Sequence, residues 1–223
     1  MAATQRRSTT SGDETKARIV QATLQTLKSE GIVGTSARAI AREGDFNQAL
    51  IFYHFGSIDD LVVAAVAEMS RRRMANHRGR LEEVESLTEM IQVARELHAD
   101  DLAADNMTVL TQAFAGAVGN SETGPKLYAE LEKWSDLVSE TLERLLADVP
   151  AAAAVIDRQQ MAQGISALFL GVELLDDLDP TKANADALFD TFEVLARLVE
   201  LLLHTPLLSA LASPDAESDA SKG

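Results

Sequence analysis

The chain has 223 residues, of which 46% are hydrophobic, with no cysteine and a formal net charge of -15, a composition that excludes disulfides and thiolate metal sites. Its longest apolar runs are too short to cross a bilayer and its first residues contain no apolar segment, so we expect a cytoplasmic protein with neither a signal peptide nor a membrane span. The acidic excess lies in residues 81–223, with 27 Asp and Glu against 8 Lys and Arg, whereas residues 1–80 have 12 basic against 8 acidic side chains, a balance suited to binding phosphates.

The N-terminal segment predicts an arm followed by a scaffold helix. Residues 1–12 are polar, and their Arg6 and Arg7 are of the type that arms insert into a minor groove. Ser11 and Glu14 have the spacing of a capping box, which predicts a helix from about Asp13 to Glu30 that Gly31 ends. Apolar side chains at i, i+4 and i+7 favour packing against the helices that follow. These side chains are Val20, Leu24 and Leu27.

The stretch from Thr35 to His54 indicates a helix-turn-helix. Thr35 or Ser36 can cap a short helix that Gly44 and Asp45 end, and Asn47 can cap a second one. On the second helix Gln48 faces away from the core, and a glutamine amide can pair with an adenine edge in a major groove. We therefore predict DNA contacts from the exposed polar and apolar side chains of the arm and the two helices. The predicted set is Arg6, Arg7, Thr35, Ser36, Arg38, Asn47, Gln48, Ala49, Leu50, Phe52, Tyr53 and His54.

A fourth helix is predicted from Ser57 to about Arg78, long enough to link two domains, with Gly79 as a joint. Its end is rich in arginine and includes His77, and we interpret this end as solvated, since cations suit a helix C-terminus. A fifth helix begins after Ser86, where Glu89 completes a capping box. The acids near its end and the single His98 do not have metal-ligand spacing, so we expect no metal ion and no cofactor.

Two further helices, Asn106–Gly119 and Pro125–Leu145, carry bulky apolar side chains at helical spacing. Such a stripe is typical of a core, but as a set these side chains could line an apolar pocket with a few polar groups. The predicted ligand-binding residues are Met107, Leu110, Phe114, Tyr128, Trp134, Phe169 and Glu173. This lining favours a small lipophilic or amphipathic effector. Beside Glu173, we expect Asp176 and Asp177 to face solvent.

The last two helices, about Asp157–Leu178 and Asn184–His204, are apolar over more than one face. A helix of this kind needs a second partner, and pairing with symmetry mates gives a four-helix dimer interface. The predicted interface residues are Leu168, Val172, Leu175, Phe192, Leu195, Val199 and Leu202. Burial within one subunit is the alternative. Residues 206–223 form a polar tail.

The order of residues from the first helix through Gly31, Thr35 and the run Ile51-Phe52-Tyr53-His54-Phe55 to Leu61 resembles the N-terminal domain of the tetracycline-repressor (TetR) family. The resemblance implies an all-α protein with a DNA-binding domain at 13–56, a linking helix at 57–80 and a ligand-binding and dimerisation domain at 81–205. The sequence departs from the family pattern at three positions. Asp45 stands where the family commonly has glycine, Phe52 where it often has tyrosine, and Ile58 where it often has a phosphate-binding lysine. Gly44 could supply the flexibility that Asp45 lacks.

Together with these observations, the resemblance implies a homodimeric transcriptional regulator, a repressor released from a palindromic operator in double-stranded DNA by a small organic effector. No Gly-rich phosphate loop, cysteine nucleophile or partnered serine is present, so we expect no enzymatic activity. The alternative is a helical adapter that binds proteins and has lost specific DNA binding.

Overall fold

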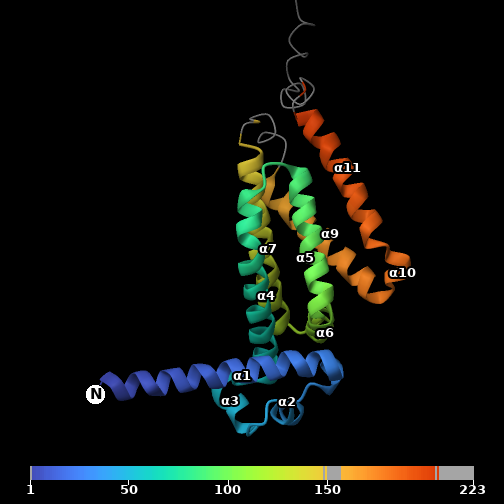
Figure 1. Ribbon diagram of the computed structural model, residues 1–223. Coiled ribbons are helices and arrows are strands. Elements are labelled where there is room, and N and C mark those ends of the chain that lie inside the picture. The colour runs from blue at the N-terminus through green and yellow to red at the C-terminus, as the bar shows by residue number, and fades with distance from the viewer. Residues whose placement is uncertain (1, 148, 150–156, 204, 206–223) are drawn as a thin grey trace, which may run out of the picture. The chain divides into compact units, whose positions relative to one another are not determined.

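The computed structural model describes residues 2–147, 149, 157–203 and 205, and it describes side chains from residue 12 onward. Within these residues every regular element is a helix, so the predicted all-α fold class is confirmed (Figure 1). The predicted tail from residue 206, the arm side chains Arg6 and Arg7, and His204 lie outside this description. The helices are α1 (Ala2–Gly34), α2 (Ala37–Glu43), α3 (Ala49–Phe55), α4 (Ile58–Glu83), α5 (Leu87–Ala104), α6 (Asn106–Ala117), α7 (Thr123–Leu145), α9 (Arg158–Leu178), α10 (Pro180–Ala183) and α11 (Ala185–Leu203).

The chain divides into two compact units. The first consists of Met1–Met74 and Asp101–Glu130, and the second of Ala75–Asp100 and Leu131–Gly223. Helices α4, α5 and α7 contribute residues to both units. The first unit therefore contains α6 as well as the three N-terminal helices, although the sequence suggested that α6 would belong with the C-terminal helices.

In the first unit, α1 lies across α2 and α3 (Figure 1). Its core is formed by apolar side chains from all three helices, because Ile19, Leu27, Ile40 and Ile51 have no exposed surface. Helix α1 begins at Ala2, so Ser11 does not mark its start. It is interrupted at Gly31, whose φ of 66° is readily adopted only by glycine, and the predicted stop is thus confirmed.

Helix α6 is held against the end of α1 by side-chain contacts that the sequence did not predict. The Gln112 amide oxygen accepts a hydrogen bond from the Ile32 backbone N–H at 2.8 Å. The Lys28 ammonium donates to the Ala104 carbonyl oxygen at the end of α5. A Cβ on Gly116 would lie 2.7 Å from Ile32 Cγ1, so glycine permits this close approach.

The end of α4 differs from the solvated end that we expected. Arg71 and Arg72 are exposed, as predicted, but Arg73 forms a buried ion pair with Asp101, which also accepts a hydrogen bond from Asn106 at 2.9 Å. His77 is buried too, with Nε2 3.2 Å from the Asp100 carboxylate. The interpretation was wrong for Arg73 and His77 because their acidic partners come from another helix, α5.

The second unit is built from the remaining parts of α4, α5 and α7 together with α9 to α11. Val172 and Phe189 form an apolar cluster with Ala185. Polar contacts fasten α11 to α5, because Arg95 pairs with Asp190 at 2.6 Å and the Thr88 N–H donates to Glu200 at 2.9 Å. One side of α11 thus belongs to the core of its own unit.

Most predicted helix starts are confirmed by capping hydrogen bonds. The Ser57, Ser86 and Asp157 side chains accept from the N–H groups of Asp60, Glu89 and Gln160 at 3.0–3.1 Å. The short helix α10 was missed. It forms because Asp179 caps a turn that has proline at its first position, and Asn184 ends it with φ of 48°.

None of the described helices is by itself long and apolar enough to span a membrane. The pair α3 and α4, which meet at a bend of 70°, passes the same test only when the two helices are taken together.

Two glycines give a matched prediction about packing. A Cβ on Gly44 would lie 2.3 Å from Phe46 Cε1 and 2.9 Å from Ala22 Cβ, whereas nothing lies within 4 Å of the corresponding position at Gly79. Gly79 is not a joint, since α4 continues through it to Glu83. We expect Gly44→Ala to lower the free energy of unfolding by about 1–3 kcal/mol, and Gly79→Ala to raise it by about 0.5–1 kcal/mol. Urea denaturation measures both, and equal effects of the two changes would contradict the steric explanation.

Candidate nucleic-acid interface

The turn between α2 and α3 is fixed by capping and by close packing. The Ser36 hydroxyl accepts from the Ala39 N–H at 3.2 Å and begins α2. The positive φ of the turn is at Asp45, with a φ of 50°, and Gly44 has a φ of -92°. Gly44 therefore does not supply the conformational freedom that we expected of it. Asp45 adopts the left-handed region itself, which aspartate tolerates better than most residues, and Gly44 is needed because its neighbours leave no room for a Cβ.

Helix α3 begins as the sequence predicted. The Asn47 carboxamide oxygen accepts from the Ala49 N–H at 2.9 Å. Gln48 stands at the boundary of the helix and makes no capping hydrogen bond with its side chain. Both side chains are exposed. The Gln48 amide is thus on the surface and is not used in closing the first turn.

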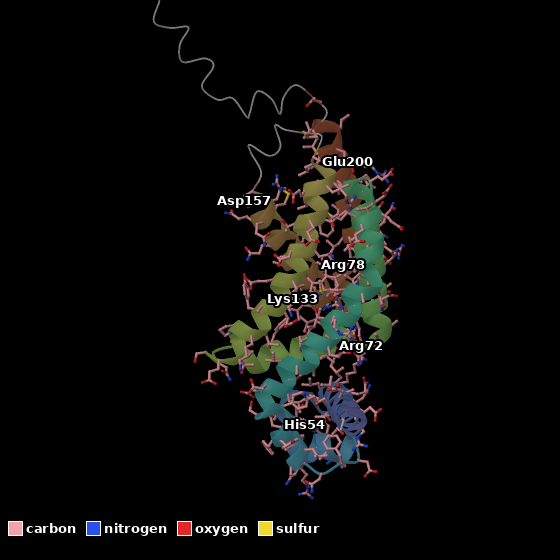
Figure 2. The ribbon with its side chains drawn as sticks, turned by 90° about the vertical axis from the view of Figure 1, so that its left-hand side faces the viewer. His54, Arg72, Arg78, Lys133, Asp157 and Glu200 are labelled. Atoms are coloured by element: carbon pink, nitrogen blue, oxygen red, sulfur yellow. The ribbon has the colours of Figure 1, made fainter. Side chains whose placement is uncertain are left out.

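The outer face of α3 combines aromatic, small and polar groups. Tyr53 is 82% exposed and Phe52 is 50% exposed, while Ile51 on the opposite face is fully buried. The Tyr53 and His54 rings contact each other edge to face, with centroids 4.9 Å apart. Figure 2 shows His54 within the α1–α3 part of the first unit. A rigid helix presenting hydrogen-bonding and apolar groups in this way can read base edges in a major groove.

The other predicted DNA-contact residues are distributed around this face. Ser36, Arg38 and Ala49 are exposed, and Thr35 and Leu50 are half-buried, as is His54. The Thr35 hydroxyl donates to the Gly31 carbonyl oxygen at 2.7 Å, which leaves its oxygen able to accept only.

The start of α4 is acidic. The Asp60 carboxylate accepts hydrogen bonds from the Lys126 ammonium and the Ser57 hydroxyl, and these bonds together with the Lys126 charge lower the pKa of Asp60. The same bond raises the pKa of Lys126. Asp59 accepts from the Asn120 amide at 3.1 Å. Both carboxylates thus have hydrogen-bond donors from the α6–α7 connection and from α7. The start of α4 nevertheless presents acidic side chains and not a basic one.

The seven predicted ligand-binding residues do not all lie in one unit. Met107, Leu110, Phe114 and Tyr128 belong to the first unit, and Trp134, Phe169 and Glu173 to the second. Met107, Leu110 and Glu173 are buried, Phe114, Trp134 and Phe169 are half-buried, and Tyr128 is exposed.

The predicted dimer residues separate into two groups. Five of them are exposed apolar side chains, namely Leu168, Leu175, Leu195, Val199 and Leu202. Val172 is buried against Ala185 and Phe189, and Phe192 is half-buried on the same cluster. Val172 and Phe192 thus contribute to the core of their own unit.

A buried polar cluster in the second unit was not predicted. His98 lies with Nδ1 3.5 Å from a Glu173 oxygen and Nε2 3.4 Å from an Asp176 oxygen. Its ring also contacts Phe189, with centroids 5.5 Å apart. Asp176 is buried, so the expectation that it faces solvent was wrong, while Asp177 is exposed as expected. No group of three or more potential ligands in the described residues has metal-binding geometry.

Comparison with known proteins places the helix-turn-helix in a recognised family. Residues 19–65 match the family model described as bacterial regulatory proteins, tetR family. This segment contains α2, α3 and the parts of α1 and α4 that pack with them. A search of curated proteins finds no match.

Solved structures share the fold over most of both chains. A protein of Pseudomonas aeruginosa PAO1 assigned as a transcriptional regulator is 25% identical, with a TM-score of 0.65, and the match covers 86% of this chain and 91% of that one. A TetR-family member from Streptomyces coelicolor A3 is 23% identical, with a TM-score of 0.61 and coverage of 82% and 98%. The regulator FadR from Bacillus subtilis, solved with stearoyl-CoA, is 15% identical, with a TM-score of 0.63 and coverage of 81% and 96%.

The buried cluster gives a prediction with a matched control. Asp176→Ala removes one of the two carboxylates beside His98, whereas Asp177→Ala makes the same change at an exposed position of α9. Both changes alter helix propensity equally, so we expect Asp176→Ala to be the less stable by about 1–3 kcal/mol, because only Asp176 is buried and faces the buried imidazole of His98. Thermal or urea denaturation of the two variants measures the difference, and equal stabilities would show that the contact contributes nothing.

Proposed function

The chain belongs to the TetR family of bacterial regulatory proteins, and we propose that it is a homodimeric repressor released from a palindromic operator by a small organic effector. Its N-terminal helix-turn-helix and its C-terminal helical region have the fold of DNA-binding transcriptional regulators. The observation that carries the proposal is the exposed outer face of α3, where Gln48, Phe52 and Tyr53 are free of the core.

In this proposal α3 lies in the major groove. The Gln48 amide pairs with an adenine edge, and Ala49 and Phe52 meet thymine methyl groups. Around them the Tyr53 phenol and the Arg38 guanidinium bind backbone phosphates, which fix the position of the helix without reading sequence. Among the other predicted contacts, the Arg6, Arg7, Ser36, Asn47 and His54 side chains can donate to phosphates at this rim, whereas Leu50 is apolar and the Thr35 hydroxyl already donates to the Gly31 carbonyl oxygen.

Dimerisation is the reason for expecting a palindromic operator, because two-fold symmetry of the protein is matched by two-fold symmetry of the DNA site. Five predicted interface side chains on α9 and α11 are apolar and exposed in the single chain, which supports association of these helices with a second copy. A two-fold dimer holds its two recognition helices at a fixed separation, and this separation sets the spacing of the half-sites.

The effector acts by favouring one arrangement of the dimer. A ligand can shift this equilibrium only by its difference in affinity between the DNA-competent and DNA-incompetent states. The hydrogen bond between Gln112 on α6 and Ile32 on α1 supports a mechanism in which a displacement of α6 also displaces α1. We propose a lipophilic or amphipathic effector because most predicted lining residues are apolar. Stearoyl-CoA, bound by one protein with this fold, is a molecule of this kind.

The first test is selection of bound duplexes from fragmented genomic DNA by the purified protein and by Gln48→Ala. We expect the unmodified protein to enrich a palindrome, which then serves as the probe for effector screening. Loss of the Gln48 amide is expected to reduce discrimination at one base pair of each half-site by about 1–3 kcal/mol. Competition with a duplex substituted at that pair measures the loss.

A folded dimer that enriches no sequence would contradict the proposal. This outcome would favour the alternative, a helical adapter that binds proteins and not DNA. Equal enrichment of the same palindrome by Gln48→Ala would leave DNA binding intact but would remove Gln48 from the base contacts.

The dimer surface gives a second prediction with a matched control. Leu202 on α11 and Leu102 on α5 are both 50% exposed, but only Leu202 lies on the proposed interface. We expect Leu202→Glu to convert the dimer to monomers at micromolar concentration, because a carboxylate buried in an apolar interface is desolvated without a partner. Leu102→Glu should leave the mass unchanged in sedimentation or light scattering. Dissociation by both changes, or by neither, would contradict the assigned interface.

A further inference from the structure

Binding of DNA requires cations near α3, and the start of α4 does not provide them. Its first three residues are Ile58, Asp59 and Asp60, and a carboxylate repels a phosphate that approaches it. The Lys126 ammonium lies at this end of α4, but it is engaged by Asp60. Cationic contacts to phosphate are therefore left to the other basic side chains of the first unit.

Most of these basic side chains are already engaged. Each of the following pairs or hydrogen bonds joins a cation to an acceptor within the first unit. They are Arg42 with Glu30, Arg71 and Arg72 with Glu68, Arg73 with Asp101, Lys126 with Asp60, and Lys28 with the Ala104 carbonyl oxygen. Within the part of this unit whose side chains are described, Lys16, Arg18 and Arg38 form no ion pair with a carboxylate. Arg38 is already among the predicted DNA contacts.

Arg18 is held at the turn that leads into α3. Its guanidinium carbon lies 5.7 Å from the centroid of the Phe46 ring, and Phe46 directly precedes Asn47, the cap of α3. Ala22 lies one turn later on the same face of α1 and contacts the turn at Gly44. The Arg18 side chain is exposed. The guanidinium thus lies within cation–π range of a ring that directly precedes the cap of α3, and the exposed N–H groups of Arg18 can reach another ligand.

We propose that Arg18 binds a phosphate of the DNA backbone beside the recognition helix, with the Phe46 ring holding the guanidinium in place. A guanidinium can stack on an aromatic face and donate two hydrogen bonds to a phosphate at the same time, because its donors lie in the plane of the group. Helix α1, which the sequence suggested was only a scaffold, then contributes to DNA binding. This inference rests on the proposed function, since it concerns the same interface.

A phosphate contact has a signature that a purely structural role of Arg18 lacks. Each neutralised phosphate contributes about 0.9 to the slope of log affinity against log salt concentration. Arg18→Ala is therefore expected to lower the magnitude of this slope by about 0.9, so that its loss of affinity is about 3.5-fold larger at 50 mM than at 200 mM salt. The loss should be similar for an enriched duplex and for a random one, because phosphates carry no sequence information.

The experiment measures fluorescence anisotropy of labelled enriched and random duplexes at several salt concentrations. The variants are Arg18→Ala, Arg18→Lys, which keeps the charge, and Arg71→Ala, which removes an exposed guanidinium that pairs with Glu68. We expect a lower slope for Arg18→Ala only, a slope close to that of the unmodified protein for Arg18→Lys, and no change for Arg71→Ala. Thermal denaturation checks that each variant is folded.

Three outcomes would overturn the inference. An unchanged slope for folded Arg18→Ala, with normal binding by the unmodified protein, removes Arg18 from the interface and leaves the proposed function standing. Equal reductions for Arg18→Ala and Arg71→Ala would show an effect of net charge alone. Absence of salt-dependent binding by the unmodified protein overturns the proposed function together with this inference. If Arg18→Ala is unfolded, the slope of Arg18→Gln decides by the same criterion.

Discussion

The close approach of α1 to the turn between α2 and α3 is the constraint on which the rest of the N-terminal unit depends. At Gly44 the chain passes so near to Ala22 and Phe46 that a Cβ would meet both. This contact fixes the turn against α1, and because the turn leads directly into α3, it also fixes which face of α3 is buried. Ile51 points into the core, and Tyr53 and Gln48 remain outside. The same contact brings Phe46 beneath Arg18.

Helix α1 is in turn held at its far end. Gly31 interrupts it with a positive φ, which exposes the N–H of Ile32, and the Gln112 side chain accepts from this N–H. A backbone donor released by a helix break must find an acceptor or remain hydrated, and here the acceptor comes from α6. The N-terminal helices and α6 therefore form one unit, because α6 completes the hydrogen bonding of α1 and the small Gly116 lets the two backbones meet.

Local features of the fold could be predicted from the sequence because their causes lie within a few residues. The caps at Ser57, Ser86 and Asn47, the helix start near Asp157 and the break at Gly31 depend on side chains and backbone conformation a few residues away, and all five were predicted. The exposure of the α3 face followed from helical spacing for the same reason. The short helix α10 was missed because residues 179–183 were left as a connection between two helices, although an Asp cap followed by a first-position proline also starts helices.

Burial of charged groups could not be predicted, because it depends on partners far along the chain. Arg73 was interpreted as a solvated cation because cations suit a helix C-terminus, and Asp176 was expected to face solvent. Asp101 lies 28 residues from Arg73, and His98 lies on α5 while its two carboxylates lie on α9. A buried ion pair is tolerated only when the partner is present. The sequence contained both members of each pair but no signal that they meet.

The two faces of α11 explain how an acidic chain can still carry a surface for self-association. The acidic side chains of this helix are turned toward its own unit, where Arg95 pairs with Asp186, Asp190 and Glu193, and Glu200 accepts from Thr88. The exposed apolar side chains Leu195, Leu198 and Leu202 recur at intervals of three and four residues, so they form a separate stripe with no acid among them. Association along this stripe would bury apolar area without bringing the acids of two copies together. The wide apolar coverage seen in the sequence thus divides into two stripes. One is buried in the core of the unit, and the other is exposed and suited to pairing with a second copy of the chain.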